Sequence, residues 1–440
     1  MNLIFQTCTI MRIRSIILIL SLVTSCSSHR DLSRDVRAHI AETWSMTVRS
    51  CTEDTPDSLI GLPRPYTVPC PDGMFNELYY WDTFFTNEGL IADGQVQMAK
   101  DNTEDILYLI DKYGFMPNGN RLWYLSRSQP PFAAAMVESV FNACADTTWL
   151  RRAYPTLVRE YSFWQENRQS PIGLNHYGGD ADAKLREEFV TTAGKRLGTD
   201  FRAKGWTEEM LSDFGRHCVA ECESGWDFNP RFQRRCEDFC PVDLNAILYG
   251  AECSMARFAK ILGTGEEQLW SGRAAARKDR IIKYLYADGA FYDYDYVNGR
   301  HSDVLSAAPF ALLFTGAVDK EHAAAVKKTL ERLEYPAGIA TCADAEYEYG
   351  YQWSFPNVWP PVVFMAVMGL DRYGYKEDAE RIAASWLDAT GALYLKTGKL
   401  WEKMTCTDGD IPQGTEYGTP SMMGWTAGTY VCFDEYLNNE

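Results

Sequence analysis

The chain has 440 residues, of which 46% are hydrophobic and 13% aromatic, so it has ample material for a large folded core. Sixty acidic residues against 43 basic ones give a formal net charge of −17. We therefore exclude nucleic acid as a partner, because nucleic-acid binding rests on a positive surface. The 25 Tyr, 13 Trp and 21 Phe are compatible with a ring-rich core and also with loops that stack on sugars.

Residues 1–26 resemble an export signal. Arg12 and Arg14 precede the apolar run 15–23, and small residues then lead to Cys26 in a stretch similar to a bacterial lipobox. We expect an exported bacterial protein, either periplasmic or held at the outer membrane by a lipid on Cys26. A plain secretory signal cleaved nearby is the alternative. No other stretch has the ~20 apolar residues of a membrane span, so this lipid is the only membrane tie we expect.

Helical periodicity recurs from residue 31 onward and predicts ten to thirteen helices with few strands. The expected helices span 31–50, 83–94, 97–113, 132–146, 149–168, 184–195, 242–262, 266–286, 302–315, 321–333, 359–370 and 376–390. No flexible linker divides them, so we expect residues 31–440 to form a single domain. Brief turns alternate with long loops, which favours an all-α toroid of paired antiparallel helices with its long loops at one end. A helical-repeat solenoid is the alternative, but the chain shows no fixed period.

Cysteine is abundant, with thirteen residues. Cys8 and Cys26 belong to the export signal, which leaves eleven, so at least one thiol must stay unpaired. Four others form two pairs with three-residue gaps that bracket one loop: Cys218, Cys222, Cys236 and Cys240. In an exported protein we expect two disulfides that clamp this loop, with a four-thiolate zinc site or free buried thiols as alternatives.

The bracketed loop places one acid, Asp227, between a flexible pair, Ser224-Gly225, and the rings of Trp226 and Phe228. Glycine lets the backbone approach a ligand, and flanking rings disfavour ionisation of a nearby carboxyl. Such surroundings suit a general acid. Taken alone, the segment is equally compatible with an Asp that caps an ordinary loop.

Hydrolysis of a glycosidic bond needs a second carboxylate in different surroundings. Glu402 is a candidate, because the neighbouring Lys403 favours its ionised form, although an exposed Glu-Lys pair is the simpler explanation of the dipeptide alone. Two glycine-rich stretches follow, at 414–418 and 424–428. Their glycines permit a loop that folds over a ligand, which favours a site here.

Five ordered segments carry a resemblance to a known family. They read PDGMF at 71–75 followed by Glu77, Tyr79, Trp81 and Asp82; PNGNR at 117–121 with YLSRSQPPF at 124–132; SGWDF at 224–228; PVDLN at 241–245; and QWSFPNVWPP at 352–361. Together they resemble the trehalases of glycoside hydrolase family 37, from about Leu62 to the carboxyl end. Five ordered matches are far more specific than any one of them.

This resemblance implies an (α/α)6 barrel and a hydrolase that inverts the sugar's anomeric configuration, with trehalose as the leading substrate and neither cofactor nor metal. Asp227 falls on the family's general acid and Glu402 on its general base. Asp227 would protonate the bridging oxygen while Glu402 activates a water on the opposite face, with the two carboxyls ~6.5–9.5 Å apart. We also expect a monomer whose partner is a small sugar.

Further positions match residues that contact the sugar in the family. Those that hold hydroxyls are Trp81, Asp82, Asn118, Arg127 and Gln129; the rings that wall the pocket are Phe75 and Trp353; the lid acid is Glu416. Gly225 joins them as the close-approach residue beside the acid. The family's Arg-Pro-Glu-Ser pattern is represented only by 185–188, which makes Arg186 and Glu187 its candidates.

Three departures from the family pattern bear on the substrate. Met74 stands where the first signature has Arg, Ser354 where the second has Asp, and Val358 where it has a small residue. These changes remove contacts that grip the hydroxyls of two glucose units, so another α-glucoside or a modified trehalose is an alternative substrate.

Two rival functions fit parts of the sequence. A phosphorylase on a similar barrel would use phosphate in place of the base and would leave Glu402 unexplained. A non-catalytic sugar-binding lipoprotein would account for the export signal and the rings, but it has no need of both Asp227 and Glu402.

Overall fold

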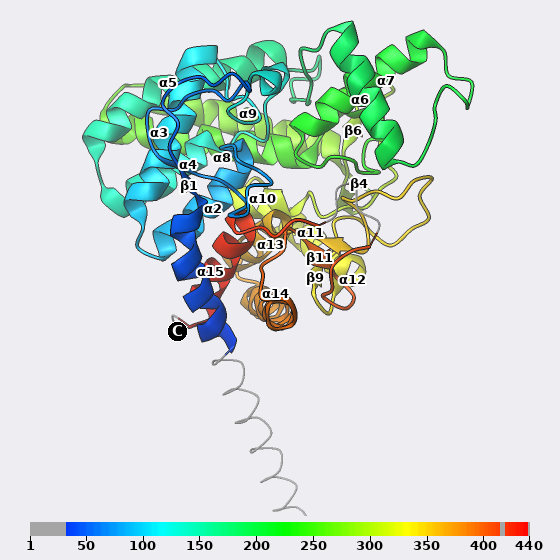
Figure 1. The fold of residues 1–440 in the computed structure, drawn as a ribbon. Coiled ribbons are helices and arrows are strands. Elements are labelled where there is room, and N and C mark those ends of the chain that lie inside the picture. The colour runs from blue at the N-terminus through cyan, green and yellow to red at the C-terminus, as the bar shows by residue number, and fades with distance from the viewer. Residues whose placement is uncertain (1–31, 414–418, 439–440) are drawn as a thin grey trace, which may run out of the picture.

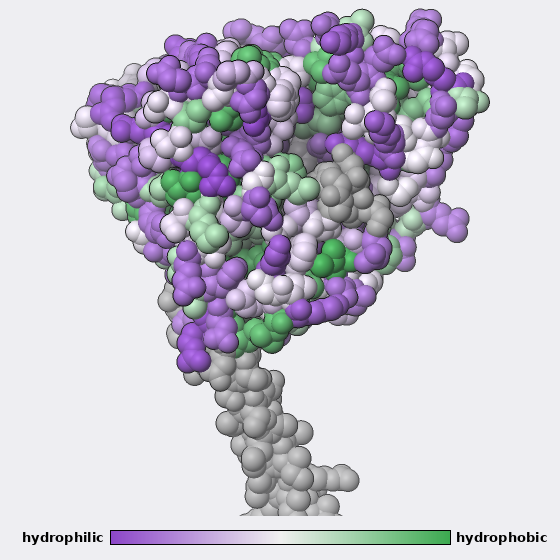
Figure 2. All heavy atoms as spheres, viewed as in Figure 1, coloured by the Kyte–Doolittle hydropathy of each residue, from purple (hydrophilic) through white to green (hydrophobic). Residues whose placement is uncertain are grey.

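The computed structural model describes residues 32–413 and 419–438. The export signal therefore lies outside the described residues, as does Glu416. Among the described residues, no helix combines the length and the apolar character needed to cross a bilayer. Hydrophilic residues cover most of the face drawn in Figure 2, which fits the high charge of the chain.

Six inner helices form a closed ring (Figure 1). They are α2 (Tyr80–Ala92), α4 (Ala133–Cys144), α8 (Val242–Leu262), α10 (Phe310–Thr315), α13 (Pro360–Arg372) and α15 (Gly424–Asn438). Each contacts the next in this order, and α15 closes the ring against α2. Helix α13 is apolar nearly all round, since every residue from Pro360 to Val367 is buried. This pattern marks a helix enclosed by others.

The outer helices cover the ring from outside. They are the helix over residues 32–43, α3 (Val96–Tyr113), α5 (Thr147–Asn167), α9 (Glu267–Leu285), α11 (Lys320–Lys328), followed by the single turn α12 (Leu330–Leu333), and α14 (Lys376–Thr397). Each packs on one or two inner helices, as α5 does on α4 and α8. They are amphipathic: α3 buries Ala99, Ile106 and Ile110 along one stripe.

The contact between α2 and α15 is unusually close. A Cβ on Gly428 would lie 2.0 Å from the Phe85 carbonyl oxygen, and one on Gly89 would lie 2.4 Å from the Gly428 Cα. These glycines therefore let two helix backbones touch. The expectation that 424–428 is part of a loop over the ligand is wrong, because the segment is the first turns of a buried helix.

A helical pair, α6 (Ala183–Arg196) and α7 (Glu208–Glu223), is inserted between α5 and α8 and stands at the upper right of Figure 1. It has its own apolar cluster, which includes Val190, Leu211 and Phe214. The sequence analysis did not predict α7. Its signals are a capping Thr207, whose side chain accepts from the Met210 amide, and apolar residues at helical spacing.

Short elements complete the chain. The 3-10 helices are η1 (Trp44–Thr47), η2 (Leu122–Ser126) and η3 (Cys236–Asp238). The two-residue strands are β1 (Val48–Arg49), β2 (Tyr66–Thr67), β3 (Phe239–Cys240), β4 (Tyr286–Ala287), β5 (Ala290–Phe291), β6 (Tyr294–Asp295), β7 (Arg300–His301), β8 (Glu334–Tyr335), β9 (Gly338–Ile339), β10 (Asn357–Val358) and β11 (Met404–Thr405). All pair antiparallel, and β10 with β11 joins two loops that border the site.

The predicted disulfides are wrong: all eleven cysteines of the described part of the chain are free. The four bracketing thiols are buried in separate surroundings, with Cys218 in the apolar cluster of the α6–α7 pair and Cys236 packed near Trp164. Cys240 donates to the Ser170 hydroxyl at 3.3 Å, and burial raises the pKa of its thiol to about 12. The described residues hold no group of three or more His, Cys, Asp or Glu that could bind a metal ion, so the free-thiol alternative fits.

Candidate active site

A cavity of about 200 Å³ lies where the N-terminal ends of inner helices meet. Five of the segments that lead into these helices line it. The start of α2 contributes Trp81 and Asp82, the segment before α4 contributes Asn118, Arg127 and Gln129, the segment before α8 contributes Gly225 and Asp227, the segment before α13 contributes Gln352 and Trp353, and the segment before α15 contributes Glu402.

Most of the predicted site residues are thus brought together. With Phe75, which also lines the cavity, ten of the thirteen positions predicted from the sequence border one hollow. Arg186 and Glu187 do not line it: the Arg186 Nε donates to the Ala181 carbonyl at 2.9 Å, and Glu187 pairs with Arg202 on the surface at 3.2 Å. Glu416 lies outside the described residues.

Asp227 is held at the cavity wall through its backbone. The Gln352 side chain donates to the Asp227 carbonyl at 2.6 Å. Gly225 has φ of 74°, and a Cβ there would lie 2.8 Å from the Trp81 ring, so only glycine fits this turn. The acid loop and the first turn of α2 are therefore packed directly against each other.

Burial raises the pKa of the Asp227 carboxyl above its ordinary value, while the charges of Arg196 and Arg127 and a hydrogen bond from the Cys222 thiol oppose the rise. The side chain keeps 31% of its surface exposed, toward the cavity, so water moderates the effect until a ligand fills the space. A carboxyl with a raised pKa is suited to donate a proton near neutral pH.

Two buried carboxylates at the end of α7 tie the acid loop to its neighbours. Glu221 accepts from the Asn229 amide at 2.7 Å, and burial raises the pKa of Glu221 to about 8. Glu223 accepts from the Ser128 amide at 2.8 Å and from the Arg168 Nε at 2.8 Å. Through these hydrogen bonds, helix α7 positions both the loop of Asp227 and the loop of Arg127.

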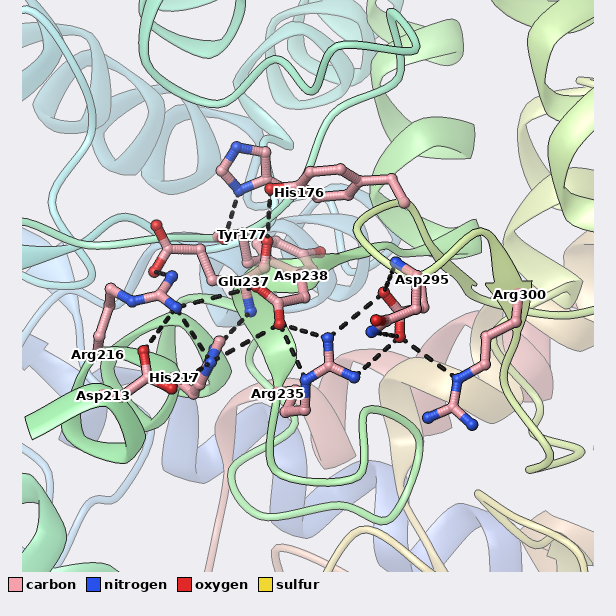
Figure 3. A network of polar contacts seen from close by, with 12 residues as sticks. His176, Tyr177, Asp213, Arg216, His217, Arg235, Glu237, Asp238, Asp295 and Arg300 are labelled. Atoms are coloured by element: carbon pink, nitrogen blue, oxygen red, sulfur yellow. Dashed lines mark hydrogen bonds and ion pairs between the residues drawn. The ribbon is translucent and has the colours of Figure 1, made fainter. Parts of the chain in front are cut away.

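A polar network continues from α7 to the strands beyond the loop (Figure 3). Arg216 pairs with Glu237 at 2.6 Å, and Arg235 links Asp238 to Asp295 with N–O distances of 2.9 Å to each. His217 lies buried inside this network, where burial and the adjacent Arg216 lower its pKa to about 4. A neutral His217 thus sits among paired charges, and the network anchors the α7–α8 connection.

Arg231 clamps the same connection from inside. Its fully buried guanidinium bonds Asp243 and Asp293 with four N–O distances of 2.9 Å, and it stacks over the Trp226 ring at 4.3 Å. Satisfied bidentate pairs of this kind fix geometry, because losing one partner would leave buried charges unpaired.

Glu402 is positioned on a different wall and is almost entirely buried, at 2% exposed. Its carboxylate accepts from the Lys403 ammonium, which in turn lies over the Trp359 ring at 4.5 Å. Trp425, at the start of α15, donates from its indole to the Glu402 carbonyl at 3.0 Å. The base candidate thus has a buried cation beside it, as the Glu-Lys dipeptide predicted, and the simpler reading of an exposed pair is wrong.

A cluster of indole rings backs the cavity wall. Trp353 stacks on Trp359 with centroids 3.8 Å apart and on Trp226 at 5.2 Å, while Trp81 lies 5.8 Å away. These rings are almost fully buried against one another, which keeps the wall rigid.

Asp82 projects into the cavity from the first turn of α2. Burial raises its pKa to about 8, and the carboxylates of Glu402 and Asp227 both add to the rise. Asp82 therefore lies within electrostatic reach of both acids. A carboxyl in this state can donate to one sugar hydroxyl and accept from another.

Arg196 is a site residue that the sequence analysis missed. It ends α6, lines the cavity, has its Nη1 3.8 Å from the Asp227 Oδ2 and stacks over the Phe228 ring at 4.6 Å. It lies ten residues beyond Arg186, about 15 Å farther along the helix. Nothing in the local sequence distinguishes the two arginines; the path of α6 over the acid loop decides between them.

The three departures from the family pattern occupy different places. Met74 is half exposed, Val358 is fully buried in the pairing of β10 with β11, and Ser354 lines a second cavity adjacent to the first. Arg127 lines the first cavity and is buried over the rings of Tyr124 and Phe189 at about 5 Å, and its buried Nε has no hydrogen-bond partner among the described residues.

Comparison with known proteins gives the family. The family model described as Trehalase matches residues 22–438. The chain belongs to the trehalase family. Among solved structures, this trehalase-family protein is similar to the neutral trehalase of Saccharomyces cerevisiae, with a TM-score of 0.72 and 29% identity over 85% of this chain and 74% of the yeast chain. A GH63 mannosylglycerate hydrolase from Thermus thermophilus, solved in complex with glucose, matches in fold with a TM-score of 0.63 and 17% identity, over 90% of this chain and 99% of that one.

These matches confirm the all-α (α/α)6 toroid and a glycoside hydrolase of the trehalase type. The ring of six inner helices is the physical form of that toroid. The solenoid alternative is excluded, because α15 closes against α2.

Proposed function

We propose that this protein hydrolyses α,α-trehalose to two glucose molecules with inversion at the attacked carbon. The observation that carries the proposal is the meeting of Asp227 and Glu402, which come from loops before different inner helices, at one ring-walled cavity. Their surroundings differ, since Asp227 lies among rings in a site that raises its pKa and Glu402 is paired with Lys403. Such a difference assigns the roles of acid and base.

In the proposed reaction Asp227 gives its proton to the bridging oxygen as the C1–O bond breaks. Glu402 takes a proton from a water that adds to C1 from the opposite side, and solvent later resets both carboxyls. Asp82, Asn118, Arg127 and Gln129 hold the hydroxyls of the attacked ring, while Phe75, Trp81 and Trp353 enclose it. Gly225 leaves room beside the acid.

The test is the configuration of the first products. Proton NMR of trehalose hydrolysis should show α- and β-glucose appearing in equal amounts before mutarotation, because only the attacked ring inverts. Early release of α-glucose alone would indicate retention and contradict the assignment of Glu402 as a base.

We also propose that the protein is exported, carries a lipid on Cys26 and acts as a monomer. The support is the lipobox-like sequence and the basic residues ahead of its apolar run. Mass spectrometry of the mature protein from a bacterial host should show diacylglycerol on Cys26, and Cys26→Ala should abolish it. A mature amino terminus elsewhere would favour a plain secretory signal. Light scattering tests the monomer.

A further inference from the structure

A second cavity of about 320 Å³ adjoins the first, and Arg196 and Gln352 line both. Its wall is formed largely by the segment before α13, where Tyr347, Tyr349 and Tyr351 alternate along the chain. It is larger than the cavity that must hold the attacked sugar ring. The second cavity therefore has room for a group larger than one sugar ring.

The second cavity lies on the side of the acid. Arg196, Phe228 and Gln352, which contact Asp227 or adjoin it in sequence, all line the second cavity. Glu402 lines the first cavity and not the second. A general acid protonates the leaving oxygen, so the leaving group must extend from the attacked ring past Asp227. The second cavity lies in that direction.

Two residues that line this cavity each have a buried amide oxygen with no hydrogen-bond partner among the described residues. Asn357, 6% exposed, uses its amide nitrogen to donate to the Gln352 carbonyl at 2.8 Å and leaves its Oδ1 without such a partner. Gln352 uses its Nε2 on Asp227 and leaves its Oε1 without one. Both oxygens can only accept, so a complementary ligand must bring donors. Hydroxyl groups meet this need, and they can also accept from the Arg196 guanidinium, which lines the same cavity.

We propose that the second cavity binds the leaving group, and that the preferred substrates are α-glucosides whose leaving group is rich in hydroxyls and larger than one glucose. The inference rests on the proposed hydrolysis and names its substrate class. The tyrosine rings supply flat faces for stacking, and the oxygens of Asn357 and Gln352 select hydroxyl donors.

Gly350 offers a way to fill the second cavity without disturbing the first. It lines the second cavity and not the first, it is exposed, and no atom of the described residues lies within 4 Å of a Cβ placed on it. Gly350→Trp should therefore fold and occupy the space. Gly272→Trp is the matched control, because Gly272 is exposed on α9 and its Cβ position is equally clear.

Four substrates separate the outcomes: α-glucosyl fluoride, which has no sugar as leaving group; trehalose; glucosyl-trehalose with a disaccharide leaving group; and trehalose 6-phosphate. We expect kcat/KM for glucosyl-trehalose to exceed that for trehalose by about tenfold. Gly350→Trp should reduce kcat/KM for glucosyl-trehalose by about tenfold or more, while kcat/KM for the fluoride stays within about twofold of the parent value. Gly272→Trp should change neither.

A higher kcat/KM for trehalose than for glucosyl-trehalose would overturn the inference, as would an equal loss on all substrates in Gly350→Trp. Trehalose 6-phosphate as the best substrate would also overturn it, because the preferred leaving group would then be a single phosphorylated glucose and not a larger group rich in hydroxyls. In each of these cases measurable hydrolysis of trehalose would leave the proposed function standing. Hydrolysis of none of the four would contradict the proposed function itself.

Discussion

The Arg196 guanidinium lies 3.8 Å from the Asp227 carboxylate, at the point where the two cavities meet. Its charge lowers the pKa of a carboxyl that burial raises. The pKa of Asp227 is therefore set by two opposed effects, of which burial is the larger. Removing the cation changes the pKa in a predictable direction.

Arg196→Gln should shift the alkaline limb of the pH profile of kcat/KM to higher pH. The general acid must be protonated to act, so activity falls as the pH rises through its pKa. Loss of the neighbouring positive charge raises that pKa further, and activity then persists to higher pH. Arg186→Gln on the same helix is the control, since Arg186 does not line the cavity. An unchanged limb in Arg196→Gln would show that Arg196 does not act on the acid.

Asp227→Asn and Glu402→Gln should each reduce kcat on trehalose by roughly 10²–10⁴-fold, the usual contribution of a general acid or base. Binding of glucose, followed by calorimetry, should survive both changes because the hydroxyl-holding residues remain. Azide should rescue Glu402→Gln alone and give a β-glucosyl azide, since a small nucleophile needs no base. Rescue of Asp227→Asn instead would reverse the two roles. Asp180→Asn, on the half-exposed loop before α6, serves as a control.

Much of this site could be predicted because its residues lie in contiguous motifs. Asp227 and Glu402 each carry their local environment with them: Gly225 and two rings for the first, Lys403 for the second. Periodicity also predicted α8 over its full extent, 242–262, because its buried apolar residues recur at helical spacing and Gly263 ends the helix in a left-handed conformation.

Other features depend on contacts between distant segments. Whether Arg186 or Arg196 reaches the acid is decided by where α6 crosses the Asp227 loop. The glycines of 424–428 have the composition of a loop, yet Gly428 is required by the Phe85 carbonyl on α2. The paired cysteine spacings suggested disulfides, but the four thiols are free and buried, with Cys222 hydrogen-bonded to Asp227 and Cys240 to Ser170. The contacting pairs, Arg196 with Asp227 and Gly428 with Phe85, are far apart in the sequence.

Gly225→Ala should destabilise the protein by roughly 1–3 kcal/mol and reduce activity more than stability alone explains. The residue has φ of 74°, and the added Cβ would approach the Trp81 ring to 2.8 Å, so the acid loop and the ring must separate. Gly272→Ala is the matched control and should be neutral or slightly stabilising, because helix α9 accommodates a side chain there. Urea unfolding and kcat/KM measured on both variants test this. Equal effects in the two would contradict the close contact.

Glu160→Gln should weaken the pH dependence of stability between about pH 4.5 and 7. Glu160 is buried, accepts from the Tyr80 hydroxyl, and has a pKa raised to about 7 by burial. Between these two pKa values the folded protein keeps a proton that the unfolded chain has released. The stabilisation that Glu160 contributes is therefore complete below its unfolded pKa of 4.5 and is lost as the pH rises through its folded pKa of about 7. The loss is at most roughly 3 kcal/mol. Glutamine stays neutral throughout, so the free energy of unfolding of the variant should fall less over this range. Glu104→Gln, a control at a partly exposed position of α3 where Arg64 lies at 2.7 Å, should leave the slope unchanged. Parallel slopes for Glu160→Gln and the parent protein would show that Glu160 is already ionised in the folded state.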